Sequence, residues 1–294
     1  MLKRIIVNKK YISTIAISIT GGIYALLGWI STFTPLDNIF PDSLSICKRL
    51  LLSLLFIVLL WAVTFVVVSV ILIKKKRYMV FSGNNGHKLF VQYGNLFSSN
   101  EVESPRERRN VLIPVNRCFD VIVDNELISE KTLHGMALNL LYSRGIYNEE
   151  ALNKHIQDQL SDCQSILLDK NQKPKGNRKR FPEGTVVDVP VDDNTHYILW
   201  ALSAFDDKLK AHTSSEEYSI AVHRMIKACN LYSEGFPVVL PLVGTGLSRT
   251  KMNQNDVLLF LVNAFKLNRT ELNCDIHIVV SDSVKEEISI MNIK

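Results

Sequence analysis

Three groups of polar or glycine residues follow short apolar runs of the chain, and these are the residues best suited to bind a ligand. Asn116 and Arg117 end one run, Asn95 follows an earlier one, and Val243-Gly244-Thr245-Gly246-Leu247 follows a later one. Glycines beside a threonine expose backbone N–H groups with no side chain in the way, which is the chemistry of an anion-binding nest. The late segment therefore predicts either a phosphate-binding loop or a tight structural turn.

Two further candidates lie between these segments. Ser129 is a residue type that caps helices, and a helix beginning there would leave free N–H groups for a phosphate. His134 is interpreted as a locally packed histidine, a ligand contact or a general base. No Ser/His/Asp or Cys/His set, HExxH motif or P-loop can be assembled from the spacing, so the residues favour binding over catalysis.

Strands and helices alternate after residue 77 and must position these side chains. Short runs rich in Val, Ile or Leu and bounded by Gly, Pro, Asn or Ser predict strands at 88–93, 110–115, 185–191, 236–243 and 275–281. Apolar residues at helical spacing predict helices at 198–209, 222–229 and 257–264. This alternation predicts an α/β domain with a mixed, largely parallel sheet flanked by helices, whose ligand lies beyond the carboxyl ends of the strands.

The charge of the chain is divided unevenly. Residues 1–77 hold ten of the 34 Lys and Arg residues and two of the 29 acidic ones, which leaves 24 basic and 27 acidic residues for 78–294. The later part therefore has no general basic character, which argues against nucleic acid as a partner. The five cysteines are scattered without metal-ligand spacing, as in a reducing compartment, and no metal or cofactor is expected.

The first 77 residues predict two transmembrane helices. Residues 11–33 and 50–73 carry no charged side chain, and about 20 apolar residues suffice to cross a bilayer. Basic residues precede the first span and follow the second, so both termini are predicted to be cytoplasmic, with the chain in the inner (plasma) membrane. The prediction is a two-pass region at 1–77 and a cytoplasmic domain at 78–294.

Two other features leave alternatives open. The pairs Ser18/Gly22 and Gly21/Ala25 have small-xxx-small spacing, which favours packing either against the second span or against another copy of the chain. The basic stretch 170–180 is interpreted as a solvated loop, or as a site that attracts anionic lipid or a phosphate ligand.

In their order along the chain, the three ligand-binding segments resemble the macro domain, a fold that binds ADP-ribose. Asn95 stands where that family has an acid that contacts the adenine amino group. Asn116 stands at the first Asn of a strand of the form I-V-N-A-A-N, and Gly244-Thr245-Gly246-Leu247 falls on the Gly-rich loop that wraps the diphosphate and distal ribose. Arg117-Cys118-Phe119 replaces Ala-Ala-Asn, and the following Gly-Gly-Gly loop is absent, so hydrolase activity is not expected.

The resemblance and the residues beside each motif predict one ligand-binding set and no catalytic set. The predicted ligand-binding residues are Asn95, Leu96, Asn116, Arg117, Ser129, His134, Val243, Gly244, Thr245, Gly246, Leu247 and Arg249.

Two spans followed by P-V-N-R-C-F-D, L-H-G and P-L-V-G-T-G-L-S-R resemble the membrane-anchored macro-domain effectors of bacterial Thoeris antiphage defence. The resemblance implies that a partner TIR-domain enzyme makes histidine-ADP-ribose from NAD, that the macro domain senses it, and that the chain then oligomerises and disrupts the membrane. The alternatives are a membrane-tethered ADP-ribosyl hydrolase and an anchor that recruits a protein partner.

Overall fold

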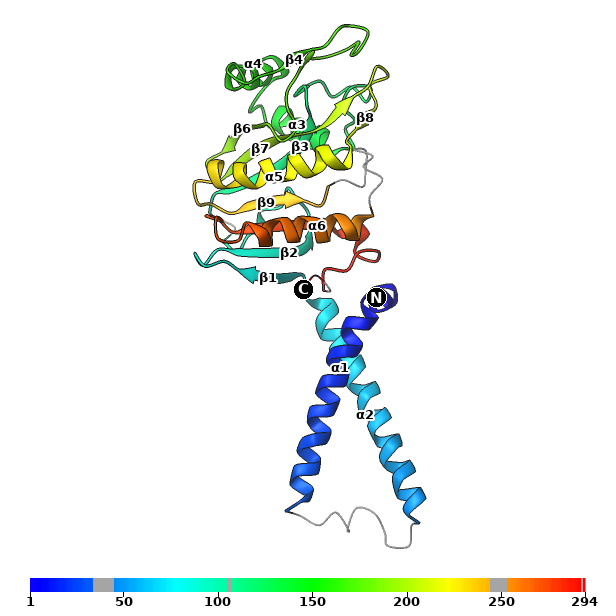
Figure 1. Ribbon diagram of the computed structural model, residues 1–294. Coiled ribbons are helices and arrows are strands. Elements are labelled where there is room, and N and C mark those ends of the chain that lie inside the picture. Colours follow the sequence, from blue (N-terminus) through cyan, green and yellow to red (C-terminus); the bar gives the residue numbers. More distant parts are fainter. Residues whose placement is uncertain (34–44, 105–106, 244–252, 292, 294) are drawn as a thin grey trace. The chain divides into compact units, whose positions relative to one another are not determined.

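The structure is a computed structural model that describes residues 1–33, 45–104, 107–243, 253–291 and 293 of the 294-residue chain (Figure 1). Its internal contacts divide it into two units. The hairpin unit comprises Met1–Lys76 together with the segment Lys285–Asn292, and the sheet unit comprises Arg77–Val284. The chain passes from the hairpin unit into the sheet unit at residues 76–77 and back at residues 284–285, and Ile293 groups again with the sheet unit.

The hairpin unit is built on two long helices, α1 (Leu2–Ser31) and α2 (Ile46–Lys74). Their buried side chains lie in the first two thirds of α1 and the last third of α2, so the helices contact each other there and not along their whole length. The buried residues are Asn8, Ile12, Ala16 and Thr20 of α1 and Thr64, Val68, Ser69 and Ile73 of α2.

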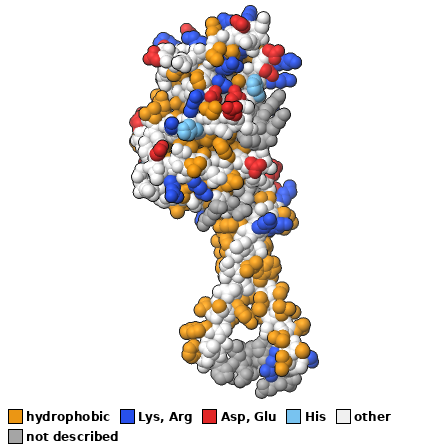
Figure 2. Space-filling model, viewed as in Figure 1, with side chains coloured by type: hydrophobic (Ala, Val, Ile, Leu, Met, Phe, Trp, Pro, Cys, Tyr) orange, Lys and Arg blue, Asp and Glu red, His pale blue; other side chains and the backbone are white. Residues whose placement is uncertain are grey.

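Both helices are long and apolar enough to cross a membrane. Within the most apolar stretch of each, only 17% (α1) and 22% (α2) of the residues are buried, so neither resembles the core helix of a soluble domain. Figure 2 shows hydrophobic side chains spread over this pair of helices. The two helices expected from the sequence are thus present.

The C-terminal segment belongs to the hairpin unit through contacts with α1. The Ser289 hydroxyl donates a hydrogen bond to the side-chain oxygen of the buried Asn8. The Glu286 carboxylate lies 3.7 Å from the Lys3 ammonium group and 3.9 Å from the N-terminal amine. This grouping with α1 has no signal in the local sequence, because residues 285–291 carry no long apolar run.

The sheet unit is a mixed sheet with the order β1-β2-β10-β9-β3-β7-β6, and β8 pairs with β7 at one end. Its five central strands are parallel, whereas β1, β6 and β8 pair antiparallel with their neighbours. The strands are β1 (Arg77–Ser82), β2 (Lys88–Gly94), β3 (Arg109–Asn116), β6 (Val186–Asp192), β7 (Thr195–Phe205), β8 (Ala211–His212), β9 (Val238–Pro241) and β10 (Ile276–Ser281). The expected mixed α/β sheet is confirmed.

Helices cover both faces of this sheet (Figure 1). On one face, α3 (Leu133–Ser143) and α4 (Glu149–Gln159) pack on alternate residues of β3, β6 and β7. On the other, α5 (Ser215–Tyr232) and α6 (Gln254–Leu267) lie side by side, and the Trp200 indole donates to the Ala221 carbonyl oxygen of α5. Between α4 and β6 in the sequence, β4 (Ile166–Leu167) and β5 (Lys179–Arg180) form a small separate antiparallel pair.

The helix predicted at 198–209 is wrong, because β7 occupies Thr195–Phe205. This strand is buried on both faces and pairs with β3 on one side and β6 on the other. Such a strand is apolar at nearly every position, so helical and strand spacings both fit its sequence. The helices predicted around 222–229 and 257–264 are confirmed as parts of α5 and α6.

Core packing under α3 should carry much of the stability of the sheet unit. Leu138 of α3 is fully buried, whereas Leu267 at the end of α6 is 85% exposed. Leu138→Ala is expected to lower the free energy of unfolding by about 2–5 kcal/mol. Leu267→Ala is expected to change it by less than about 0.5 kcal/mol. Denaturant unfolding of the full chain in detergent, followed by circular dichroism, measures both, and equal losses would contradict this packing.

Candidate functional site

A cavity of about 640 Å³ opens at the carboxyl ends of the parallel strands. It is lined by Pro114–Asn116 at the end of β3, by Leu202, Ser203 and Phe205 at the end of β7, and by Leu242 and Val243 after β9. The carboxyl ends of parallel strands meet at one edge of a sheet, which is where open α/β sheets bind ligands. The cavity therefore lies where the sequence predicts the ligand, beyond the carboxyl ends of the strands.

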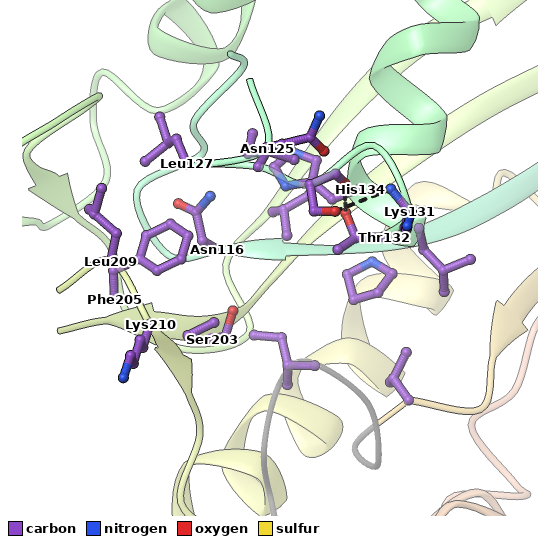
Figure 3. Close-up of a pocket in the computed structure, with 18 of the residues that line it drawn as sticks. Asn116, Asn125, Leu127, Lys131, Thr132, His134, Ser203, Phe205, Leu209 and Lys210 are labelled. Carbon is purple, nitrogen blue, oxygen red and sulfur yellow. Dashed lines mark hydrogen bonds between the residues drawn. The ribbon is translucent and has the colours of Figure 1, made fainter. Parts of the chain in front are cut away.

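Asn116 forms part of the cavity wall, which Phe205 and Leu127 also line (Figure 3). The Asn116 Oδ1 accepts hydrogen bonds from the backbone N–H groups of Cys118 (3.0 Å) and Asp120 (3.5 Å). Its Nδ2 is buried and makes no hydrogen bond of ordinary geometry within the described part of the chain. Burial raises the pKa of the Asp120 carboxyl, and a side-chain hydrogen-bonding interaction with Asn116 is one of the effects that oppose this rise. A buried donor without a well-formed hydrogen bond costs free energy, so the Asn116 amide is suited to donating to a ligand in the cavity.

The second wall of the cavity is the loop 125–132 and the start of α3. Asn125 adopts a left-handed backbone conformation (φ +62°), and Asp124 accepts hydrogen bonds from the N–H groups of Glu126 and Leu127. The Lys175 ammonium group hydrogen-bonds to the Asp124 carboxylate, and with the two N–H groups it lowers the pKa of this carboxyl to about 2. These contacts hold the loop in a compact turn.

The predicted helix cap at Ser129 is wrong, because α3 begins three residues later and is capped by Thr132. The Thr132 hydroxyl accepts from the Gly135 N–H at 2.9 Å, and the Ser129 hydroxyl accepts from the Lys131 N–H. Ser129 nevertheless lines the cavity. The first N–H groups of a helix have no partner inside the helix, so the start of α3 at the cavity wall is suited to an anion.

His134 lines the cavity and is 7% exposed. Burial lowers the pKa of its imidazole from 6.5 to about 3, although a hydrogen bond to the backbone of Asp120 opposes the shift. The ring is therefore neutral at physiological pH. A neutral, backbone-bonded imidazole is suited to shaping the cavity or donating to a ligand rather than to carrying a positive charge.

Positive charge at the cavity comes from two lysines. Lys131 of the loop and Lys210 after β7 both line it, and neither forms an ion pair with any residue that the structure describes. Glu126 also lines it but contacts the Lys175 ammonium group. The cavity thus combines two available cations, a helix start and apolar walls from Leu127, Phe205 and Leu209. Residues 1–33, 45–104, 107–243 and 253–291 contain no cluster of three His, Cys, Asp or Glu side chains able to hold a metal ion.

Four of the predicted ligand-binding residues are brought together by the cavity, namely Asn116, Ser129, His134 and Val243. Three others lie away from it. The Asn95 side chain accepts from the Phe97 N–H in a local turn, and Leu96 is buried in the core. The Arg117 guanidinium is held by Glu183 (3.0 Å), Glu217 (2.9 Å) and the Phe181 carbonyl oxygen (2.9 Å).

The remaining predicted residues lie outside the described residues. They are Gly244, Thr245, Gly246, Leu247 and Arg249. Val243, the last described residue before them in the chain, lines the cavity. Their role in ligand binding stays a prediction.

The β7–β8 connection is the part of the site that sequence reasoning missed. Phe205, Leu209 and Lys210 line the cavity from this hairpin. Asp206 accepts from the N–H groups of Lys208 and Lys210, and Leu209 has a φ of +55°. An aspartate that closes a turn directly after an apolar run is a turn signal, and it was hidden by the prediction of a helix over the same residues.

A profile of the family described as "Thoeris protein ThsA, Macro domain" matches residues 89–281, which is about two thirds of the chain. The chain belongs to this family. The match begins in β2 and ends with β10, so it contains all five parallel strands and every residue lining the cavity. It leaves out α1 and α2.

A curated relative is "Thoeris protein ThsA" from Bacillus amyloliquefaciens (strain Y2), which is 26% identical over 192 residues. That alignment covers 64% of this chain and 59% of the relative, so the chain matches less than two thirds of the relative's length.

Among solved structures, the Oceanobacillus iheyensis macrodomain with ADP is 9% identical, with a TM-score of 0.43, and the match covers 71% of this chain and 90% of that one. The macrodomain of Mycobacterium tuberculosis DarG is 15% identical, with a TM-score of 0.38, and the match covers 64% and 96%.

The low pKa of His134 has a consequence for stability. A histidine whose pKa is lower in the folded state than in the unfolded state contributes no penalty above about pH 6.5, and it destabilises the fold progressively as pH falls toward about 3. His134→Gln is therefore expected to reduce the loss of stability in acid. His223→Gln, at an exposed position of α5, should leave that loss unchanged. Urea midpoints measured at several pH values compare the two, and equal acid sensitivity would show that His134 is not buried in its neutral form.

Proposed function

We propose that this chain is a membrane-anchored, ligand-sensing effector of Thoeris antiphage defence whose sheet-unit cavity binds an ADP-ribose-type nucleotide. The observation that carries the proposal is the buried Nδ2 of Asn116, which makes no hydrogen bond of ordinary geometry among the described residues and lies in a cavity at the carboxyl ends of the parallel strands, in a chain of the ThsA macro-domain family. The rest of the proposal follows from the chemistry of the lining.

The cavity suits a nucleotide diphosphate in size and in charge. Small-molecule sites are commonly about 300–1,000 Å³ in volume, and this cavity lies within that range. Lys131, Lys210 and the start of α3 would face the diphosphate, because anions are stabilised by ammonium groups and by helix N-termini. Phe205 and Leu127 offer apolar surface to a sugar or a base.

Binding is favoured over catalysis. His134 has a pKa too low for an efficient base near neutral pH, and Glu126 is drawn to Lys175. An ADP-ribosyl hydrolase remains the second candidate from the fold, and release of ADP-ribose from a modified protein by the purified chain would favour it over a sensor.

The two long helices give the proposed effector its membrane location. In the proposed topology they cross the inner (plasma) membrane, with both termini and the sheet unit in the cytoplasm. Basic residues flank the spans on that side, and the exposed side chains of α1 and α2 are largely apolar. The lipid bilayer is then the first partner of the chain.

The signal and the output rest on the family. We propose that a TIR-domain enzyme supplies histidine-ADP-ribose, and that its binding biases the chain toward a homo-oligomer that disrupts the membrane. A ligand shifts such an equilibrium only by binding one arrangement more tightly than the other. The two chain crossings, from α2 into β1 and from β10 into the C-terminal segment, provide the covalent route between cavity and membrane helices.

Ligand binding is tested by titration calorimetry of the full chain in detergent with ADP-ribose and histidine-ADP-ribose. The wild-type chain is expected to bind, and Asn116→Ala to weaken binding at least about fivefold, because a bound ligand would lose a buried donor. Asn139→Ala changes an exposed residue of α3 and should bind as the wild type does. No heat and no thermal stabilisation with either ligand would refute the proposed function.

Assembly is tested on the small-residue face of α1. A Cβ atom added at Gly21 or Gly22 would meet no described atom within 4 Å, so the contact between α1 and α2 does not use this face. Gly22→Leu is expected to spare ADP-ribose binding and to reduce the ligand-dependent oligomer, measured by cross-linking in membranes. Leu54→Ile, at an exposed position of α2, is the matched control. Unchanged assembly of Gly22→Leu would exclude this face from the interface.

A further inference from the structure

Lys173 is a lysine with no exposed surface, which is rare for this residue type. It lies in the strap, defined here as residues 169–177 between β4 and β5. Its Nζ is 3.0 and 3.1 Å from the two carboxylate oxygens of Asp120 and 2.6 Å from the Lys175 carbonyl oxygen. It also lies 5.7 Å from the centre of the Phe205 ring, which lines the cavity.

The strap also closes over the Asp120 carboxylate with its backbone. The Asn177 N–H donates to Asp120 Oδ1 at 2.6 Å, and the Asn177 side chain donates to the Phe119 carbonyl oxygen. Gly176 has a φ of +76°, and a Cβ atom there would lie 2.2 Å from Asp120 Oδ1. Only a glycine therefore permits this approach, and the carboxylate is enclosed by the strap.

Asp120 is in turn bonded to the cavity wall. Its backbone N–H donates to Asn116 Oδ1, and its backbone is the hydrogen-bond partner of the His134 ring. Both residues line the cavity, from different elements. A continuous path therefore runs from Lys173 through Asp120 to Asn116 and His134.

A second contact fixes the same strap to the loop at the other side of the cavity. The Lys175 ammonium group pairs with the carboxylates of Asp124 (2.6 Å) and Glu126. Glu126 lines the cavity, and Asp124 shapes the turn that follows. The strap thus holds both ends of the segment 120–126.

We propose that Lys173 is the positioning residue of this site: its buried ion pair with Asp120 sets the placement of Asn116 and His134 in the cavity wall. The inference deepens the proposed function and rests on it for the identity of the ligand, but the placement of the two side chains can be tested without a ligand. Lys173 acts through Asp120 and does not itself touch the cavity.

The charges around Asp120 determine how the ion pair responds to pH. Burial raises the pKa of the Asp120 carboxyl, and Lys173 and the Asn177 N–H oppose that rise. The other titratable groups beside it are the His134 ring, which is neutral near pH 7, the Cys118 thiol and, across a small cavity, Glu149 and Glu150 of α4. None of these four supplies a positive charge near neutral pH, so without Lys173 the pKa of Asp120 rises further.

A carboxyl whose pKa is raised in the folded state stabilises the fold as pH falls through that pKa. Lys173→Met leaves the Asp120 carboxylate buried without its ammonium partner at about pH 8, and lowering the pH to about 5.5 shifts the group toward its neutral form, because its pKa is raised. This variant is expected to bind ADP-ribose at least about tenfold more weakly than the wild type at the higher pH, and to recover affinity and melting temperature at the lower. Lys170→Met, an exposed strap lysine, should match the wild type at both pH values.

The variants are compared as full chains in detergent by calorimetry, thermal unfolding and NMR of the His134 ring and Asn116 side-chain amide. The NMR signals should shift in Lys173→Met and not in Lys170→Met. If the wild type binds neither ADP-ribose nor histidine-ADP-ribose, the proposed function fails, and the NMR signals still decide whether Lys173 positions Asn116 and His134.

If Lys173→Met does not fold, the double variant Lys173→Met with Asp120→Asn decides instead. It keeps both side-chain volumes and removes both charges, and it is expected to fold, to shift the two signals and to show no recovery in acid. The proposal would be overturned if the variant that folds, single or double, kept the wild-type NMR signals of His134 and Asn116 and the wild-type affinity for ADP-ribose.

Discussion

The parallel pairing of β2, β10, β9, β3 and β7 is the constraint on which the site depends. Parallel strands end at one edge of the sheet, so the residues that follow each strand meet there although they are far apart in the sequence. The cavity is lined after β3, β7 and β9 for this reason. Because the strand interiors are buried on both faces, the polar residues that can meet a ligand are confined to these ends.

Several charged side chains of the sheet unit are paired within the chain, whereas some of its buried polar atoms have no hydrogen-bond partner among the described residues. Arg117 is held by two glutamates, Lys173 by Asp120 and Lys175 by Asp124 and Glu126. The Asn116 Nδ2 stays without a hydrogen bond of ordinary geometry among the described residues. In the proposed sensor, a ligand in the cavity would accept the hydrogen bond that this amide donor lacks.

The division into two units gives the proposed sensor its output. The chain enters the sheet unit through β1 and leaves it through β10, and both strands are hydrogen-bonded to β2. β10 also pairs with β9, whose carboxyl end reaches the cavity at Leu242 and Val243. The C-terminal segment that follows β10 is bonded to α1 in the hairpin unit. A change in the strand ends around a ligand therefore has a short covalent path to the helices.

The sequence alone determined the two apolar helices, the mixed sheet and the place of Asn116 at a strand end, because each depends on local hydrophobicity and residue type. It failed at β7, where burial on both faces removes the alternation that distinguishes a strand from a helix. It left the role of the basic stretch 170–180 undecided, because the burial of Lys173 depends on Asp120, which is 53 residues away in the sequence. Only the tertiary structure showed that Lys173 pairs with Asp120 and that Arg117 pairs with Glu183 instead of facing the cavity. It also showed that Phe205 and Lys210 line the cavity. Long-range pairing of charges and the route of a hairpin are set by packing, and no local pattern encodes them.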